Sequence, residues 1–187
     1  MTFQKFFTPA FLLIAALFVF AGTADAADIS LFIGAELPGS VDNDGVKTPL
    51  GNGPVYGVRL GNNFMRYLGT EHTLALSSDY LFPGENTSVE EAKGFLYSSN
   101  LVLNFPDINK KMIPFLTAGA GLIHQYGDRD LPVGTKFAFN YGGGLKFPNL
   151  AGPLGARVDL RGYRAGLFSK KLNIFELSFG VMVSFGR

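Results

Sequence analysis

The sequence predicts an all-β fold, an eight-stranded antiparallel up-and-down barrel, and three observations lead to that prediction. In eight separate segments, apolar residues alternate with small or polar ones, as they do in strands whose side chains point to opposite faces in turn. Clusters of residues that favour turns separate these segments. No segment shows a persuasive 3.6-residue period, so short antiparallel connections are expected instead of crossover helices.

The composition supports one folded domain with few charges. The 187 residues include 24 Gly and 19 Phe, no Cys and no Trp, and 17% of them are charged. A disordered chain or a coiled coil would carry more charge. Lys and Arg number 16 against 15 Asp and Glu, and this balance predicts no nucleic-acid partner. Without cysteine, the sequence excludes a disulfide framework and a thiolate metal site.

Residues 1–26 are predicted to be a signal peptide and not part of the fold. A basic residue precedes an apolar run from Phe6 to Phe20, and Ala24 and Ala26 give the A-x-A pattern that signal peptidase reads. An apolar core of about 10–15 residues is too short for a membrane span, which needs about 20. Cleavage after Ala26 is therefore expected, and residues 27–187 are predicted to form one exported domain.

Each predicted strand is recognised by its apolar face. In chain order, the apolar residues of the eight strands are Ile29, Leu31, Ile33 and Leu37; Tyr56, Val58 and Leu60; Leu74, Leu76, Tyr80 and Phe82; Phe95, Tyr97, Leu101 and Leu103; Leu116, Ala118, Ala120 and Leu122; Phe137, Phe139, Tyr141, Leu145 and Phe147; Ala156, Val158 and Leu160; and Phe175, Leu177, Phe179, Val181, Val183 and Phe185. The last strand alternates without interruption, whereas Leu96 and Val102 break the pattern of the fourth.

Turn regions are predicted wherever Gly, Pro, Asn and Asp gather between these strands. They are Pro38 to Gly53, Asn62 to Glu71, Pro83 to Val89, Pro106 to Lys111, Gly127 to Gly134, Pro148 to Pro153 and Ala165 to Leu172.

The less apolar face of the strands distinguishes two kinds of barrel. A soluble barrel of the lipocalin type turns its apolar face inward and covers its outer face with charged residues. Here the second face is mostly Gly, Ser, Ala, Asn and Thr, which suits the narrow interior of eight strands, and the opposite face carries rows of Phe and Leu, which suit lipid. The sequence thus predicts an eight-stranded antiparallel up-and-down transmembrane β-barrel. A secreted lipocalin-like carrier of an apolar ligand is the alternative.

Sparse charges of both signs on that second face form the candidate site, a network inside the lumen. The predicted members are Glu36, Arg59, Asp79, Lys136, Lys146, Arg157, Asp159, Arg161 and Glu176. Arg157, Asp159 and Arg161 share one face of one strand, and the acids of other strands are their candidate partners. Buried charges require partners, so we expect a paired network that plugs the lumen. A narrow gated ion path is the alternative interpretation of the same residues.

Three segments carry a resemblance to a known family. They are the proline-aromatic segment with alternating glycine Ile113–Leu122, the segment Tyr141–Phe147 and the segment Gly155–Tyr163. They resemble strands of the small OmpA-like and OmpX-like outer-membrane β-barrels. The resemblance implies a Gram-negative outer membrane, both termini in the periplasm and four outer loops. These loops would be Pro38–Asn52, Pro83–Glu90, Gly127–Gly134 and Ala165–Leu172.

The resemblance also implies partners. These are the outer-membrane lipid and lipopolysaccharide around a monomeric barrel, and the outer-membrane assembly machinery during biogenesis. Members of this group usually end on an aromatic residue that the machinery recognises, whereas here Gly186 and Arg187 follow the last Phe. We interpret the end of the final strand as the assembly signal, followed by a two-residue tail. The predicted signal residues are Phe179, Val181, Val183 and Phe185.

The two histidines are candidate catalytic residues, because lipid A deacylases of the PagL type use Ser, His and Glu on an eight-stranded barrel. In that family Ser and His lie two residues apart on one strand, whereas Tyr126 stands two residues after His124 and Leu74 two after His72. No catalytic, cofactor-binding or metal-binding residue is therefore predicted. We expect a non-enzymatic barrel that acts in envelope integrity or in surface contact through its loops. A pore and a lipid A-modifying enzyme are further alternatives.

Overall fold

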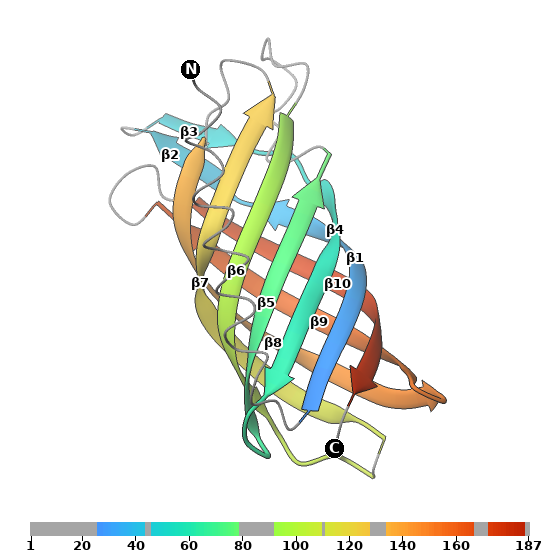
Figure 1. The fold of residues 1–187 in the computed structure, drawn as a ribbon. Coiled ribbons are helices and arrows are strands. Elements are labelled where there is room, and N and C mark those ends of the chain that lie inside the picture. Colours follow the sequence, from blue (N-terminus) through green and yellow to red (C-terminus); the bar gives the residue numbers. More distant parts are fainter. Residues whose placement is uncertain are drawn as a thin grey trace, which may run out of the picture.

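Eight β-strands close into a barrel in which every neighbouring pair is antiparallel (Figure 1). The computed structural model describes residues 26–43, 46–78, 92–109, 111–127, 134–166 and 172–185. The barrel strands are β1 Ala26–Pro38, β4 Gly53–Asn63, β5 Leu68–Ser77, β6 Ala92–Asn104, β7 Ile113–Gly127, β8 Thr135–Ala151, β9 Leu154–Ala165 and β10 Leu172–Phe185. β1 pairs with both β4 and β10, which closes the ring. The predicted eight-stranded up-and-down barrel is confirmed.

Alternation along the strands separates an apolar outer surface from a buried interior. Outward positions carry large apolar side chains that stay exposed, such as Leu31 at 66% and Leu160 at 61%. Inward positions of the same strands are buried, among them Ser30 and Asp159. Polar residues therefore line much of the interior while apolar residues cover the outside, opposite to the arrangement that a lipocalin-like carrier requires.

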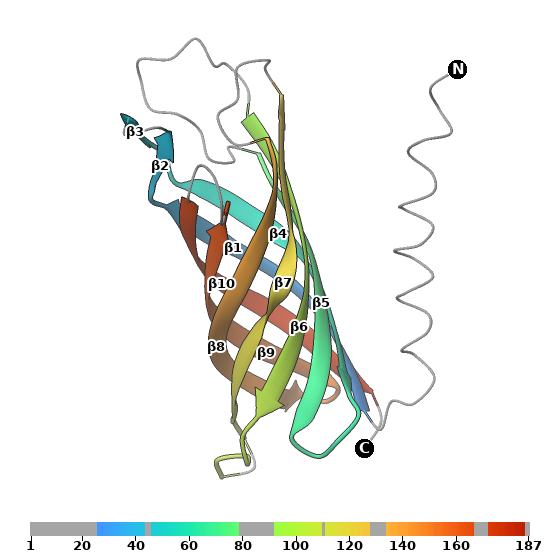
Figure 2. The same cartoon turned by 90° about the vertical axis from the view of Figure 1, so that its left-hand side faces the viewer.

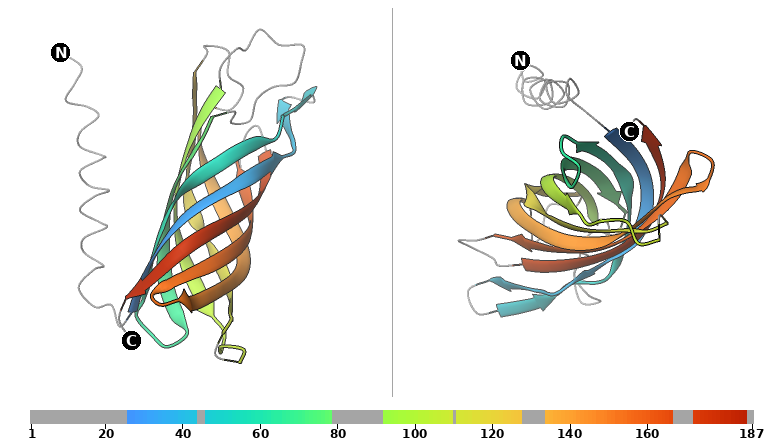
Figure 3. Two further views of the ribbon diagram at one scale, coloured as in Figure 1. Left: turned by 90° about the vertical axis from the view of Figure 1, so that its right-hand side faces the viewer. Right: turned by 90° about the horizontal axis from the view of Figure 1, so that it is seen from below.

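The two ends of the barrel differ in their connections. Ala27 pairs with Phe185, so β1 begins where β10 finishes, at what we call the termini end (Figure 3). The turns β4–β5, β6–β7 and β8–β9 lie at this end as well. The opposite end, which we call the hairpin end, carries a separate two-stranded sheet of β2 (Ser40–Asn43) and β3 (Val46–Pro49) (Figure 2). This sheet lies within the predicted loop Pro38–Asn52, where the sequence predicts only turn.

Two other predicted turns are partly wrong. The turn predicted from Asn62 to Glu71 is shorter, because β4 continues to Asn63 and β5 begins at Leu68. The backbone pairing of these two strands extends almost to the turn itself. The turn predicted from Pro148 to Pro153 is shorter too, because β8 runs to Ala151 through an irregular stretch of pairing with β9.

Some predictions fall outside the described residues. They concern the signal peptide up to residue 25, the apolar residues Tyr80 and Phe82, the turn Pro83–Val89, and the tail Gly186 and Arg187. The signal peptide and its cleavage site stay predictions. In the part of the chain that the structure describes, no helix has the length and apolar character needed to cross a bilayer.

Candidate functional site

A cluster of charged side chains fills the centre of the barrel, and three residues of β9 form its base. Arg157, Asp159 and Arg161 alternate along the strand, so all three point inward, and each is at most 1% exposed. Arg157 donates from Nε and Nη2 to the two carboxylate oxygens of Asp159, each at 2.8 Å. Arg161 donates from Nη2 to the same carboxylate at 2.7 Å. A two-pronged Arg–carboxylate pair of this kind is both strong and geometrically specific.

Glu71 ties β9 to the opposite wall of the barrel. It stands on β5, which is separated from β9 by three strands in either direction around the ring. Its carboxylate accepts from Arg157 Nη1 at 2.7 Å on one oxygen and from Arg161 Nη2 at 2.6 Å on the other. Side chains therefore bridge the lumen from wall to wall at this level.

Arg59 and Glu176 form the second half of the charged cluster. Arg59, on β4, donates from Nη2 to Glu176 on β10 and to Ser178 Oγ, the latter at 3.1 Å. Tyr163 donates its hydroxyl proton to the other Glu176 oxygen at 2.7 Å. Arg59 Nη1 lies 3.5 Å from Asp159, which joins the two halves. Each ionised group thus has an opposite charge within reach, as burial requires.

Toward the termini end, the interior widens into a polar cavity of about 890 Å³. Asp28 and Lys146 line it, and Lys146 Nζ lies 2.9 Å from an Asp28 oxygen. Arg157 Nη1 lies 4.0 Å from the other Asp28 oxygen. The Arg157 guanidinium also lies 4.8 Å from the centre of the Phe115 ring, a cation–π contact. The inner end of this cavity is therefore linked to the charged cluster.

Toward the hairpin end, an apolar layer takes the place of the charges. Its side chains are buried, pack into one cluster and come from seven of the eight barrel strands and from the connection before β4. They are Leu50, Val55, Ala75, Leu96, Ile123, Ala138, Ala165, Leu172 and Ile174, and the same cluster continues to Phe32 on β1 and Tyr163 on β9, which also contact or lie near the charged side chains. The prediction of a polar lumen therefore describes only part of the interior. Leu96, which breaks the alternation of its strand, points inward into this layer, where burial of apolar surface stabilises the fold.

Glu36 is the exception among the buried charges. It is 1% exposed and stands beside Glu176 in the β1–β10 register, yet neither of its oxygens has a hydrogen-bond partner in the described structure. The described interior contains five buried acids and four buried bases, and the other four acids take up the bases. The acids are Asp28, Glu36, Glu71, Asp159 and Glu176, and the bases are Arg59, Lys146, Arg157 and Arg161. The expectation that Glu36 pairs across the barrel is wrong.

Comparison with known proteins connects this geometry to one class of barrel. No protein-family model and no curated protein sequence matches the chain. The crystal structure of Neisserial surface protein A matches with a TM-score of 0.63 at 16% identity, over 87% of this chain and 98% of that one. The chain has the fold of the eight-stranded outer-membrane β-barrels. The outer membrane protein OprG from Pseudomonas aeruginosa shares this outer-membrane barrel fold with a TM-score of 0.61 at 12% identity, over 88% of this chain and 98% of that one.

One structure with the outer-membrane barrel fold is an enzyme. The outer membrane enzyme PagL matches with a TM-score of 0.51 at 18% identity, over 82% of this chain and 97% of that one. In the present chain both histidines occupy outward positions. His124 Nδ1 lies 2.7 Å from Thr135 Oγ1, and His72 Nδ1 lies 3.2 Å from a tyrosine hydroxyl. Ser178 and Glu176 point into the lumen, so the barrel wall separates them from both histidines.

The structure brings some of the predicted site residues together and leaves others apart. Six of them join the charged cluster: Arg59, Lys146, Arg157, Asp159, Arg161 and Glu176. Glu36 lies beside the cluster without a described partner, and Lys136 is half-buried on β8 nearer the hairpin end. Asp79 lies outside the described residues. The predicted signal residues Phe179, Val181, Val183 and Phe185 occupy outward positions on β10, and their role stays a prediction.

Sequence reasoning missed Glu71, Asp28 and Tyr163 as members of the cluster. Glu71 falls within the predicted turn Asn62–Glu71, although the alternation of β5 extends back to it from Leu74. Asp28 shares the inward parity of β1 with Ser30 and Glu36, so the same rule also locates it. Among the described residues, no group of three or more acids or histidines is arranged to hold a metal ion.

Proposed function

We propose that the protein is a non-enzymatic barrel of the bacterial outer membrane that contributes to envelope integrity and does not conduct ions. The single observation that carries this proposal is the double closure of the interior. The charged cluster crosses the lumen through Glu71, and the apolar layer covers it on the side of the hairpin end. The exposed apolar outer surface and the outer-membrane neighbours support the location.

A pore would need a water path through both layers. The six central charged groups are each at most 1% exposed, so little solvent reaches them in the described structure. They are Arg59, Glu71, Arg157, Asp159, Arg161 and Glu176. Beyond them, the nine packed side chains of the apolar layer are buried and carry no polar group that could replace the water shell of a hydrated ion. A role as a stable structural element of the envelope fits this interior better than transport.

Gel mobility tests whether the protein forms a closed barrel in the membrane. Protein from the membrane fraction is run in SDS with and without boiling, and we expect the unboiled sample to migrate differently because the closed barrel resists SDS. Protein recovered from the soluble periplasm with no mobility shift would contradict the proposal. Steady single-channel currents in a planar bilayer would contradict the closed interior but not the membrane barrel.

The hairpin end favours a second role, contact with molecules outside the cell. β2 and β3 form an ordered sheet outside the barrel ring, with a continuous register from Ser40–Pro49 to Asn43–Val46 (Figure 2). An epitope inserted between Asn43 and Val46 is expected to be labelled by antibody on intact cells. The matched control is the same epitope after Gly152 in the β8–β9 turn, which should be labelled only in broken cells. Labelling of the control alone on intact cells would reverse the proposed orientation.

A further inference from the structure

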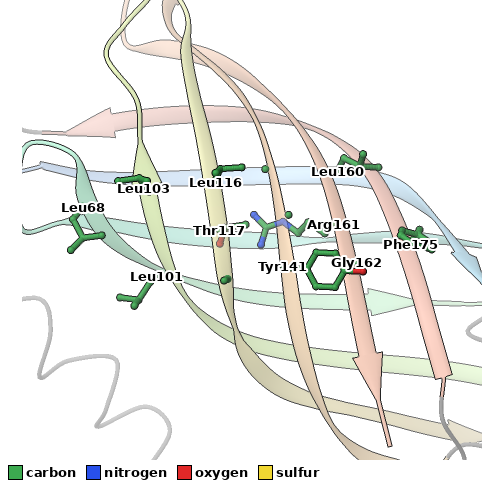
Figure 4. Close-up of a pocket in the computed structure, with 13 residues that line it drawn as sticks. Leu68, Leu101, Leu103, Leu116, Thr117, Tyr141, Leu160, Arg161, Gly162 and Phe175 are labelled. Atoms are coloured by element: carbon green, nitrogen blue, oxygen red, sulfur yellow. The ribbon is translucent and has the colours of Figure 1, made fainter. Parts of the chain in front are cut away.

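A groove of about 640 Å³ crosses the outer surface of the barrel from β5 to β10 (Figure 4). It runs along the hydrogen-bonding direction, roughly at right angles to the strands, because its wall residues stand in register on neighbouring strands. Two cross-strand rows enclose it: Leu68, Leu103, Leu116, Gly143 and Leu160 in one, and Leu101, Ala118, Tyr141, Gly162 and Phe175 in the other.

Small outward residues on three consecutive strands lie along the groove. They are Ala118, Gly143 and Gly162, and their row neighbours in the groove are Leu101, Leu116, Tyr141, Leu160 and Phe175. The Tyr141 ring lies over Gly162, where a Cβ atom would come within 2.7 Å of Tyr141 Cζ. At Gly143 a Cβ atom would come within 2.6 Å of the Phe115 carbonyl oxygen, so the backbone excludes a larger side chain there. Leu116 Cδ2 lies 3.0 Å from the same Gly143 Cβ position, so of these three small residues Ala118 alone is exposed.

The walls of the groove offer a ligand mainly hydrocarbon. Leucines of β5, β6 and β7 line one part, and Tyr141, Leu160 and Phe175 line the other (Figure 4). Thr117 and Arg161 belong to the lining from inward positions and are buried. The groove is open sideways on the surface that, in the proposed function, meets the hydrocarbon of the membrane. A lipid acyl chain is thus the occupant whose chemistry fits.

The rise of the groove along the barrel axis matches the thickness of one membrane leaflet. It crosses five strand spacings of about 4.8 Å, or about 24 Å along the surface. With strands tilted by about 40°, that path climbs about 15 Å, half of the roughly 30 Å hydrocarbon core. It begins at Leu68, two residues after the exposed Arg66 in the β4–β5 turn. Arg66 also lines the polar cavity at the termini end, and its guanidinium lies 5.1 Å from the Tyr67 ring centre. A cation at that boundary is complementary to a lipid phosphate.

We propose that this groove binds one acyl chain of an anionic phospholipid from the leaflet at the termini end, with the phosphate on Arg66. The inference rests on the proposed membrane location. It goes further, because it assigns a specific lipid site to one side of the barrel and distinguishes that side from the rest of the apolar surface.

The lack of Trp in the sequence allows a site-specific test. Leu101→Trp places an indole in the groove, and Ile29→Trp places one at an exposed outward position of β1, outside this groove and outside the second apolar pocket that Leu31 and Tyr56 line. The full-length protein with either substitution is reconstituted into phosphatidylcholine vesicles that contain a small fraction of brominated phosphatidylglycerol. We expect quenching of the groove Trp about threefold above the level set by lipid composition, which corresponds to a modest site preference. Quenching of the Trp on β1 should equal the level set by the lipid composition of the vesicles.

Matched variants separate the groove from the general surface. Ala118→Leu fills the groove and should return the quenching of the groove Trp to the composition level. Ala120→Leu, at the next outward position of β7, should leave the excess unchanged. Arg66→Gln should reduce the preference for phosphatidylglycerol by about twofold to threefold, as expected for loss of an exposed charge pair.

The outcomes distinguish this inference from the proposed function. If both Trp reporters follow the lipid composition, or if Ala118→Leu leaves the excess intact, the groove is not a lipid site even though the barrel lies in the membrane. If the unmodified protein fails to enter vesicles and shows no gel shift, the membrane location fails, and the lipid site fails with it.

Discussion

Glu36 and Glu176 stand next to each other on β1 and β10 and are buried alike, yet their surroundings differ. Glu176 accepts from Arg59, from Tyr163 and from Ser178. Glu36 has no hydrogen bond in the described structure. A buried polar group without a partner loses its hydration uncompensated, whereas a partnered one organises the groups around it. Removal of the carboxyl group is therefore expected to have opposite effects on stability at the two positions.

We expect Glu36→Met to raise the free energy of unfolding by about 1 kcal/mol, because it removes a buried carboxyl group that has no partner. Glu176→Met should lower it by about 3–5 kcal/mol, because Arg59 would then be left without its closest carboxylate. Urea unfolding in lipid vesicles measures both variants. A loss of stability in Glu36→Met as large as that in Glu176→Met would show that Glu36 has a partner after all.

Among the described residues, Glu71 links opposite walls of the barrel through two arginines. Glu71→Gln removes the charge with little change of shape and leaves Arg157 and Arg161 with Asp159 as their main counter-charge. We expect the free energy of unfolding to fall by about 3–5 kcal/mol, the usual effect of breaking a buried ion pair. Asp107→Asn, at an exposed acid of the β6–β7 turn, is the control and should change stability by less than about 0.5 kcal/mol.

Inward glycines let β7 lie close against β6. A Cβ atom on Gly121 would stand 1.9 Å from the Tyr97 carbonyl oxygen, and one on Gly119 would stand 2.2 Å from that of Ser99. Backbone atoms cannot move aside as the end of a flexible side chain can. The glycine alternation that marks this strand in the sequence is therefore a packing requirement of a narrow barrel.

Gly121→Ala is expected to lower the free energy of unfolding by about 1–3 kcal/mol, because β6 and β7 must separate slightly to admit the methyl group. Heating the unboiled sample in steps before electrophoresis measures the effect as a lower temperature for loss of the folded band. Ala120→Leu on the outward face of the same strand should leave that temperature nearly unchanged. Equal effects of the two substitutions would contradict a role for the inward glycine in strand packing.

For the molecule as a whole, closure depends on two layers that differ in chemistry. We expect Arg161→Ala to lower stability without creating conductance, because the apolar layer at the hairpin end remains in place. Planar-bilayer recording, with the wild type beside the variant, measures conductance. A steady current in the variant alone would show that the charged cluster is the only barrier, and a steady current in the wild type would show that neither layer seals the interior.

The architecture could be predicted from the sequence because a period of two is a local property of a strand. The uninterrupted alternation from Phe175 to Phe185 identifies β10 without knowledge of any other strand. Partner choice inside the barrel is not local: Glu71 and Arg161 lie 90 positions apart and on opposite walls. Glu36 and Glu176 share residue type and inward parity, and the positions of Arg59, Tyr163 and Ser178 distinguish them.

The apolar layer shows a second limit of the same kind. Alternation indicates which residues point inward, but it does not indicate how high in the barrel each one stands. The height depends on strand tilt and register, which bring Val55, Leu96 and Ile123 to one level near the hairpin end. The sequence therefore predicts an interior of mixed residues, and the three-dimensional register sorts them into layers.

The seam between β1 and β10 has a consequence for how the protein is made. It joins the two extremes of the described chain, with Ala27 opposite Phe185 and Pro38 opposite Ile174. Until β10 has been synthesised and has paired with it, β1 has a free edge whose peptide groups would each cost several kcal/mol in hydrocarbon. In the proposed membrane location, insertion therefore waits for complete translation. A nonsense codon before β10 would then produce an open sheet with free edges, not a smaller barrel.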